Sequence, residues 1–364
     1  MRIALVSTGL GRVLRGFESF TESLFHALRL YAPHIDVTLF QGGGQRGERR
    51  IVIPNLHRFD APARWFGYEK GNQLEKRSFA LALYPLLRSG GYDIVHYNEL
   101  VMGSALFHLR RWLGGKFKLL YCNGAPSPPV HYHHRCDFAQ MLHGPMYDEA
   151  IAYGLPESRL FLLSYGVDTE HFSTNTHSFR LATRRELGIP ADALVVMTAA
   201  ALNCWHKRVD YIIREVAALD VPVWFIGAGE RTDETPHLEK KAERLLPNRY
   251  RFLSWPHNKV NLLYGAADAF VLASLSEGFG MVIIEALASG VPVIVHNGPQ
   301  FRWITDQTDS KCIDMAQPGT LTATLNQILF SNPVSNGRAV AVERFSWDSL
   351  IPEYLRMYEI IGNP

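Results

Sequence analysis

The chain has 364 residues, of which 47% are hydrophobic and 20% are charged, so it can bury two ordinary globular cores. These values exclude a disordered or collagen-like chain, and a net charge of +2 gives no indication of nucleic-acid binding. Its apolar runs have the length of strands or short helices, which predicts neither a signal peptide nor a membrane-spanning helix. We therefore expect a two-domain cytoplasmic protein.

Charge is distributed unevenly along the chain. Residues 1–170 contain 19 Lys and Arg against 15 Asp and Glu, whereas the remainder contains 18 against 20. An N-terminal domain that meets an anionic acceptor or a membrane surface would fit this excess, although a solvated surface is the commoner explanation. The four cysteines lack the paired spacing of a metal site, so we expect free thiols in a reducing compartment.

Strand and helix patterns alternate from the first residue, which predicts parallel sheets covered by helices. In the first half, helices are predicted over 17–30 and 74–87. The predicted strands of this half are 3–7, 37–40, 94–97 and 118–121.

A second series of strands follows and predicts a second sheet. These strands are 193–200, 223–227, 250–253, 269–272 and 291–295. We place the domain boundary near 165–172, which gives an N-terminal domain of residues 1–168 and a C-terminal domain of residues 169–345. The last segment, 346–364, carries apolar residues at helical spacing and predicts a helix.

A glycine-containing loop follows the first strand and leads into the first helix. It contains Gly11, Arg12 and Gly16. A dinucleotide-binding loop is one interpretation, but Leu14 breaks the Gly-x-Gly-x-x-Gly spacing. A simple tight turn is the other alternative.

The most informative block is 276–295, which combines a strand exit, a glycine loop, a short buried helix and another strand. Glu277 and Glu285 bracket the loop and the first helical turns. Backbone amides at the start of a helix lack internal partners and suit a diphosphate, while a carboxylate one turn later can accept hydrogen bonds from sugar hydroxyls. The block therefore predicts a site for a phosphorylated ligand.

This Glu-x7-Glu block around Gly-Phe-Gly resembles the nucleotide-sugar signature of family-4 retaining glycosyltransferases. Residues 163–172 look like the Asn-Gly-Val-Asp linker of that family, and 223–230 look like its second-domain strand and glycine turn. The resemblance implies the GT-B fold: two Rossmann-like α/β domains whose parallel sheets face each other across a cleft. It also implies that the N-terminal domain binds the acceptor, that the C-terminal domain binds the nucleotide sugar, and that the helix in 346–364 crosses back to the first domain.

The same resemblance implies roles for individual residues. Glu277 would contact hydroxyls of the transferred sugar, and Glu285 the nucleotide ribose. Lys207 would contact the donor diphosphate, where positive charge stabilises the leaving group, and Arg208 would replace an Arg that the family places where this chain has Ala201. The residues expected around the donor's phosphates and base are Gly11, Arg12, Gly16, Leu253, Trp255, Gly278, Phe279, Gly280, Met281 and Val282.

Asn123 takes the place at which the family often has a histidine near the reacting sugar, and we expect it to act there. The cluster of His131, His133 and His134 suggests metal ligation, but no matching carboxylate or cysteine set is evident, and a polar acceptor loop is the better interpretation. The chain also lacks an Asp-x-Asp pair, so we expect metal-independent chemistry without a cofactor.

Together these features predict a retaining hexosyltransferase that uses a nucleotide-diphosphate sugar and a hydroxyl of a glycan, lipid-linked or cell-envelope acceptor. The alternatives are a nucleotide-sugar epimerase of the same fold and a non-catalytic nucleotide-sugar-binding subunit. No nucleic-acid partner is expected. The runs Arg64-Trp65-Phe66 and Arg110-Arg111-Trp112 would suit peripheral contact with the inner face of a membrane.

Overall fold

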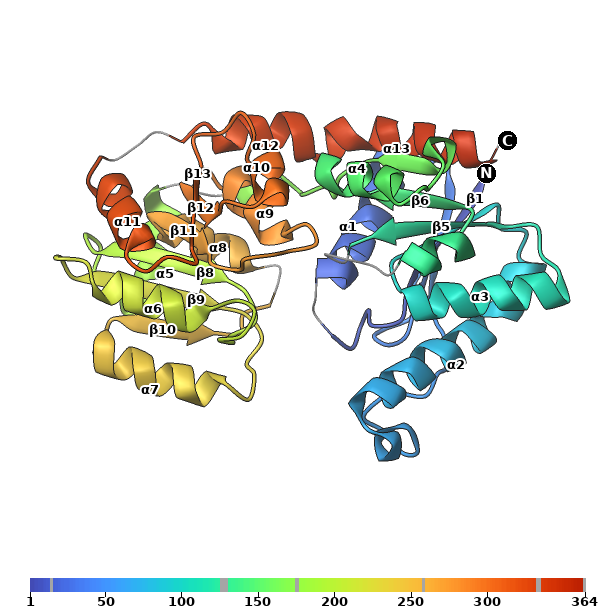
Figure 1. Ribbon diagram of the computed structural model, residues 1–364, viewed down its shortest axis with the longest axis horizontal. Helices are drawn as coiled ribbons and strands as arrows, with labels where there is room; N and C mark the ends of the chain where they lie inside the picture. Colours follow the sequence, from blue (N-terminus) through green and yellow to red (C-terminus); the bar gives the residue numbers. More distant parts are fainter. Residues whose placement is uncertain (14–15, 125–129, 174–176, 257–258, 332–334, 363–364) are drawn as a thin grey trace. The chain divides into compact units, whose positions relative to one another are not determined.

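The computed structural model describes the chain except residues 14–15, 125–129, 174–176, 257–258, 332–334 and 363–364. The chain divides into two compact units (Figure 1). The first is Met1–Gly166 together with Trp347–Pro364, and the second is Val167–Ser346. The sequence had placed these divisions at 168/169 and 345/346.

The first unit contains a seven-stranded sheet in the order β3-β2-β1-β4-β5-β6-β7. All its strand pairs are parallel. Ile3, Ala4, Leu5 and Val6 of β1 are at most 1% exposed, because helices cover both faces of a parallel sheet. The strands are β1 (Arg2–Ser7), β2 (Asp36–Gln41), β3 (Arg50–Val52), β4 (Ile94–Tyr97), β5 (Lys118–Asn123), β6 (Phe138–Met141) and β7 (Leu160–Leu162).

Helices connect these strands and bury one face each. In α1, for example, Phe20, Leu24 and Leu28 recur every four residues and are fully buried. The helices of this unit are α1 (Gly16–Tyr31), η1 (Ala63–Phe66), α2 (Tyr68–Ser89), α3 (Leu100–Leu113), η2 (Val130–Arg135), α4 (Gly144–Ala152), η3 (Glu157–Arg159) and α13 (Trp347–Gly362).

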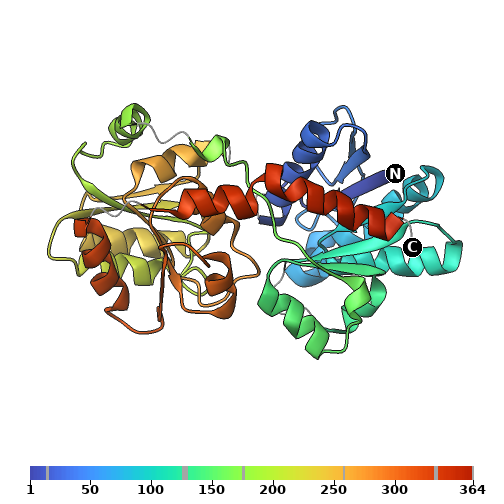
Figure 2. The same cartoon turned by 90° about the horizontal axis from the view of Figure 1, so that it is seen from above.

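The C-terminal helix α13 is part of the first unit, and Figure 2 shows it lying along that unit. Gln140 donates a hydrogen bond to Tyr354 Oη at 2.9 Å, and His96 Nδ1 shares one with Tyr358 Oη at 2.8 Å. Burial lowers the pKa of His96 to about 3, so this imidazole is neutral near pH 7. Buried polar contacts therefore fix the register of α13 on the sheet.

The second unit contains a six-stranded parallel sheet in the order β10-β9-β8-β11-β12-β13. Val195, Val196 and Met197 in the central strand β8 are fully buried. The strands are β8 (Leu194–Ala199), β9 (Val223–Ala228), β10 (Tyr250–Leu253), β11 (Ala269–Leu272), β12 (Val293–His296) and β13 (Lys311–Ile313). The helices are η4 (His171–Ser173), α5 (His177–Glu186), α6 (Val209–Ala217), α7 (Thr235–Leu245), α8 (Val260–Ala266), α9 (Met281–Ala288), α10 (Pro299–Ile304), α11 (Thr320–Ser331) and α12 (Gly337–Phe345).

The prediction of two Rossmann-like domains with parallel sheets is confirmed. In each sheet the strand order reverses at one point, between β1 and β4 in the first unit and between β8 and β11 in the second. Loops that leave the carboxyl ends of the two strands at such a point diverge and leave room for a ligand. Within the described ranges, no helix is both long and apolar enough to cross a membrane.

Candidate functional site

Lys207 and Glu277 form an ion pair at the strand-order reversal of the second unit. Lys207 follows β8 and Glu277 follows β11, and these two strands are hydrogen-bonded neighbours. Lys207 Nζ lies 2.5 Å from Glu277 Oε1, with side chains that are 19% and 11% exposed. Residues 70 positions apart are thus brought together because their strands are adjacent.

Asn203 holds the loop that carries Lys207. Its Oδ1 accepts hydrogen bonds from the backbone N–H groups of His206 at 3.2 Å and Lys207 at 2.8 Å. Its own side chain is buried. The sequence did not single out this residue, and the only signal for it was an amide side chain shortly after a buried strand.

Arg208 lies next to this pair but has structural partners. Its Nη1 donates to the carbonyl of Met315 at 2.7 Å and to that of Ala273 at 3.3 Å, and its guanidinium stacks over the Tyr211 ring at 4.6 Å. The backbone of Arg208 is left-handed, with φ of 52°. The role of Arg208 at the donor diphosphate therefore stays a prediction. Its observed contacts join three segments of this unit.

The glycine loop leads directly from Glu277 into α9. Gly278 and Phe279 are buried, and the Phe279 ring packs edge-on against Phe345 with centroids 6.2 Å apart. Gly280 is the N-cap residue with φ of 89°, a conformation that favours glycine. Met281 and Val282 form the half-buried first turn of the helix, whose early N–H groups lack helical acceptors.

Glu285 lies one turn further along α9 and is only 4% exposed. Tyr264 Oη donates a hydrogen bond to Glu285 Oε2 at 2.8 Å. Burial, and then the negative charge of Glu285, hold the pKa of Tyr264 well above its ordinary value. The phenol therefore remains a donor that orients this carboxylate, a role that the sequence did not reveal.

The exit of β10 carries Leu253 and Trp255, both half-buried. Gly229 N–H donates to the Leu253 carbonyl at 2.8 Å, and Ser254 Oγ donates to the Gly229 carbonyl at the same distance. These bonds join the loops that follow β9 and β10. His257, which belongs to the same predicted segment, lies outside the described residues.

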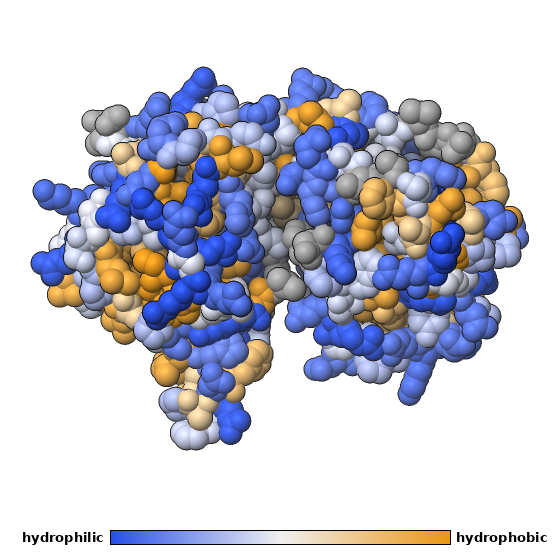
Figure 3. All heavy atoms as spheres, turned by 180° about the vertical axis from the view of Figure 1, so that it is seen from behind, coloured by the Kyte–Doolittle hydropathy of each residue, from blue (hydrophilic) through white to orange (hydrophobic). Residues whose placement is uncertain are grey.

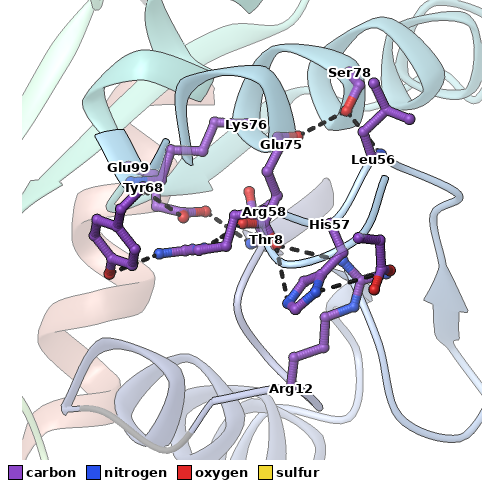
Figure 4. A network of polar contacts seen from close by, with 11 residues as sticks. Thr8, Arg12, Leu56, His57, Arg58, Tyr68, Glu75, Lys76, Ser78 and Glu99 are labelled. Carbon is purple, nitrogen blue, oxygen red and sulfur yellow. Dashed lines mark hydrogen bonds and ion pairs between the residues drawn. The ribbon is translucent and has the colours of Figure 1, made fainter. Parts of the chain in front are cut away.

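The predicted residues of the N-terminal loop lie in the first unit. Gly11 has φ of 81°, and a Cβ there would come within 2.4 Å of the Gly43 backbone, so only glycine fits. Gly16 is the first residue of α1. Arg12 Nη1 lies 3.4 Å from Glu75 Oε1, within a network of polar contacts shown in Figure 4.

Asn123 is at the end of β5, and its side chain is buried. Its Nδ2 lies 3.5 Å from Met141 Sδ, and its Oδ1 accepts from Tyr121 Oη at 3.4 Å. A small cavity is lined by Asn123, Glu149 and His133, among others. Burial lowers the pKa of His133 to about 4. Among the residues that the structure describes, no three His, Cys, Asp or Glu side chains are grouped as a metal site.

The structure thus brings Lys207 and Glu277 into contact and places Glu285 on the helix that follows the same glycine loop. It places Gly11, Arg12, Gly16 and Asn123 in the other unit. None of these positions tests the predicted contacts with a donor, so the site residues stay predictions.

Comparisons with known proteins agree with this architecture. Residues 193–330 match the family model "Glycosyl transferases group 1". The chain is 28% identical over 306 residues to the D-inositol 3-phosphate glycosyltransferase of Mycolicibacterium vanbaalenii, covering 74% of this chain and 67% of that one. It is 31% identical over 193 residues to the lipopolysaccharide core biosynthesis glycosyltransferase LpsE of Rhizobium meliloti. This match covers 50% of this chain and 55% of that one.

A solved structure extends the similarity over the whole chain. Anabaena Alr3699/HepE in complex with UDP-glucose superposes with a TM-score of 0.78 over 99% of both chains, at 18% identity. This confirms the GT-B fold. The chain spans little more than half the length of several curated relatives that it matches.

Proposed function

We propose that this chain is a retaining hexosyltransferase of glycosyltransferase family 4, in which the Glu-x7-Glu motif from Glu277 to Glu285 binds a nucleotide-diphosphate sugar. The observation that carries the proposal is the Lys207–Glu277 ion pair beside the glycine loop that opens α9. It places a cation, a carboxylate and a helix N-terminus at the point of a parallel sheet where ligands bind.

Lys207 has the position and charge to contact the donor diphosphate. Negative charge grows on the leaving phosphate as the glycosidic bond breaks, so a fixed ammonium stabilises the transition state more than the bound donor. Asn203 accepts a hydrogen bond from the backbone N–H of Lys207 and so orients this part of the loop. The ammonium of Lys207 is thereby held in place before the donor binds. Glu277 then has an oxygen available to accept hydrogen bonds from hydroxyls of the transferred sugar.

Glu285 is proposed to bind the ribose of the nucleotide. A buried carboxylate needs hydrogen-bond donors, and Tyr264 supplies one of them. The two hydroxyls of a ribose can supply the others. Leu253 and Trp255 at the end of β10 are the proposed edge of the base site.

The proposed substrates take support from relatives. The Mycolicibacterium relative is named for inositol 3-phosphate, the Rhizobium relative for the lipopolysaccharide core, and the HepE structure contains UDP-glucose. We accordingly propose transfer to a hydroxyl of a glycan, lipid-linked or cell-envelope acceptor. Metal independence follows in this proposal from Lys207 providing the charge that a divalent ion would otherwise bring, in a chain without an Asp-x-Asp pair.

Peripheral contact with the inner face of a membrane, from the cytoplasm, belongs to the same proposal. Trp65 and Phe66 are 72% and 56% exposed and follow Arg64. Exposed aromatic rings beside a cation suit the interfacial region of a bilayer. Such contact would bring a lipid-linked acceptor to the N-terminal unit.

The test is transfer from a radiolabelled donor panel of UDP-, GDP- and ADP-hexoses to glycan and glycolipid acceptors, with and without EDTA. We expect a product whose anomeric configuration, read by NMR, equals that of the donor, at a rate that EDTA leaves unchanged. Inverted product or EDTA-sensitive transfer would contradict the proposed mechanism. Epimer formation without acceptor would indicate the epimerase, and binding without turnover a non-catalytic subunit.

A further inference from the structure

Two exposed apolar side chains lie on the loops at the strand-order reversal of the second unit. Trp205, in the loop after β8, is 77% exposed, and Leu275, in the loop after β11, is 41% exposed. Figure 3 shows hydrophobic side chains among polar ones on the face of this unit that it draws, so exposure alone does not identify a site. Each of these two residues, however, lies two positions before a member of the Lys207–Glu277 ion pair.

One hydrogen bond joins the two loops next to these residues. His206 Nε2 lies 3.2 Å from the Ser276 carbonyl oxygen and 3.9 Å from Glu277 Oε1. A carbonyl oxygen only accepts hydrogen bonds, so Nε2 carries the proton, and Nδ1 of the neutral imidazole is an acceptor. Because His206 follows Trp205 and Ser276 follows Leu275, this bond brings both apolar residues to adjacent parts of the two loops, beside the ion pair.

The backbone around Trp205 is held from both sides. Cys204 N–H donates to Glu234 Oε2 at 2.5 Å, and Asn203 Oδ1 accepts from His206 N–H at 3.2 Å. The Trp205 ring also stacks on the His206 ring, with centroids 5.2 Å apart and planes inclined by 27°. The indole is thus presented to solvent from a fixed loop, and little conformational entropy is lost when a ligand covers it.

The groups on this surface suit the ring of a sugar. One face of a hexopyranose carries mostly C–H groups, which pack against an indole, while the hydroxyls around the ring bind polar neighbours. His206 Nδ1 can accept from such a hydroxyl, and Leu275 adds apolar surface on the adjacent loop. A nucleotide base would also stack on an indole, but the base site is proposed at the end of β10, two strands from β8 in the sheet order.

We propose that Trp205, His206 and Leu275 form a binding surface for a pyranose ring, and that this ring belongs to the acceptor. Assigning the ring to the acceptor rests on the proposed function. In single-step transfer with retention, the bond from the anomeric carbon to the phosphate oxygen breaks, the bond to the acceptor oxygen forms on the same face, and the hydroxyl proton passes to the phosphate. The acceptor ring therefore lies beside the cation that holds this phosphate. Lys207 is the proposed cation, and Trp205 lies two residues before it.

The first experiment follows the indole N–H signals in proton–nitrogen correlation spectra of the labelled full chain. The chain contains seven tryptophans, and the signal of Trp205 is the one that disappears in Trp205→Phe. The ligands are cellobiose, maltose and lactose, with sorbitol as a polyol that has no ring, and UDP. We expect a disaccharide to shift the Trp205 signal and sorbitol to leave it unchanged. No shift with any of these disaccharides, or a shift with UDP alone, would overturn the proposal.

The second experiment measures affinities by calorimetric titration. Trp205→Ala should raise the Kd of the disaccharide by about tenfold, whereas Trp205→Phe, which keeps an aromatic face, should raise it by no more than about threefold. Phe330→Ala is the matched control, because Phe330 is also exposed, at 59%, in the same unit. It lies in the last turn of α11, which runs back from the carboxyl end of β13 toward the other edge of the sheet. Phe330→Ala should leave the Kd unchanged, and an equal loss in both Ala variants would overturn the proposal.

Binding of the donor separates an acceptor ring from the transferred sugar. The nucleotide sugar used is the one of the UDP-, GDP- and ADP-hexoses that stabilises the chain against heat. We expect Trp205→Ala to leave its Kd within about twofold, and the disaccharide to shift the Trp205 signal when this nucleotide sugar is already bound. An equal loss of affinity for both ligands, or competition between them, would assign the ring to the donor and overturn the proposal. Stabilisation by no nucleotide sugar would count against the proposed function alone, because the disaccharide titration still tests the surface.

Discussion

The Lys207→Met substitution separates the catalytic role of the ion pair from its structural role. Met keeps the length and apolar stem of the side chain but removes the charge that lies 2.5 Å from Glu277. At an effective dielectric constant of about 20, two unit charges about 4 Å apart attract by roughly 4 kcal/mol, and desolvation offsets most of this. We therefore expect a loss of unfolding free energy of about 1 kcal/mol, or about 2–4 °C in Tm.

The kinetic effect should be much larger than the effect on stability. Removal of one preorganised charge-stabilising donor costs about 2.7–4 kcal/mol in the transition state, so kcat should fall by on the order of 10²–10³-fold. Initial rates of sugar transfer at saturating donor would measure it. Lys241→Met is the matched control, because Lys241 forms a similar half-buried pair with Asp210 in the same unit, at 3.3 Å.

Lys241→Met should lower stability by a similar amount and leave kcat within about threefold of the unmodified chain. A structural ion pair changes the measured rate only through the fraction of the protein that is folded. A Lys207→Met variant that retains kcat within that same range would refute the assignment of Lys207 to the leaving group. A fall in kcat of equal size in both variants would mean that the effect comes from stability.

Tyr264→Phe should weaken nucleotide-sugar binding by about tenfold, because it removes the donor that orients Glu285; a titration that shows unchanged affinity would contradict that role. Asn203→Ala should cost about 1–2 kcal/mol of stability and lower kcat, whereas Asn203→Asp should restore much of both, as denaturant melts and rates would show. His96 binds a proton more readily in the unfolded chain, because its folded pKa is lowered to about 3, so stability should be lost as pH falls from about 6.5 toward 3. His96→Gln should reduce that slope by up to about 1.4 kcal/mol per pH unit in urea melts, and an unchanged slope would exclude His96 as its source.

Much of the fold could be predicted from hydrophobic patterning. The strands expected at Ile94–Tyr97, Tyr250–Leu253 and Ala269–Leu272 have those bounds in the structure. The strand expected over 291–295 instead begins at Val293, because Pro292 has no N–H to donate to a ladder. β6 was missed because Gln140 interrupts its apolar pattern, and its partners on Leu163 and Tyr354 come from distant parts of the chain.

The candidate site, like the fold, could be predicted from the sequence only in part. The glycine loop and the two glutamates could be found because they are contiguous in sequence, whereas the contact of Glu277 with Lys207 depends on the pairing of β8 with β11. The polar contacts of Glu75 shown in Figure 4 were missed, although one signal was available. Glu75 occupies the same helix face as Phe79 and Leu83, at positions four and eight residues later, and a carboxylate among buried positions requires a partner.

We propose above all that the second unit binds a nucleotide-diphosphate sugar through the Glu277–Glu285 block. The most direct measurement is thermal unfolding of the purified chain with UDP-, GDP- and ADP-sugars and with NAD, each with and without EDTA. A ligand at about 100 times its Kd stabilises the folded state by about 2.7 kcal/mol. We expect an EDTA-resistant rise in Tm with one nucleotide sugar that is lost in Glu285→Ala; a rise with NAD alone, or one that Glu285→Ala retains, would contradict this assignment of the donor site.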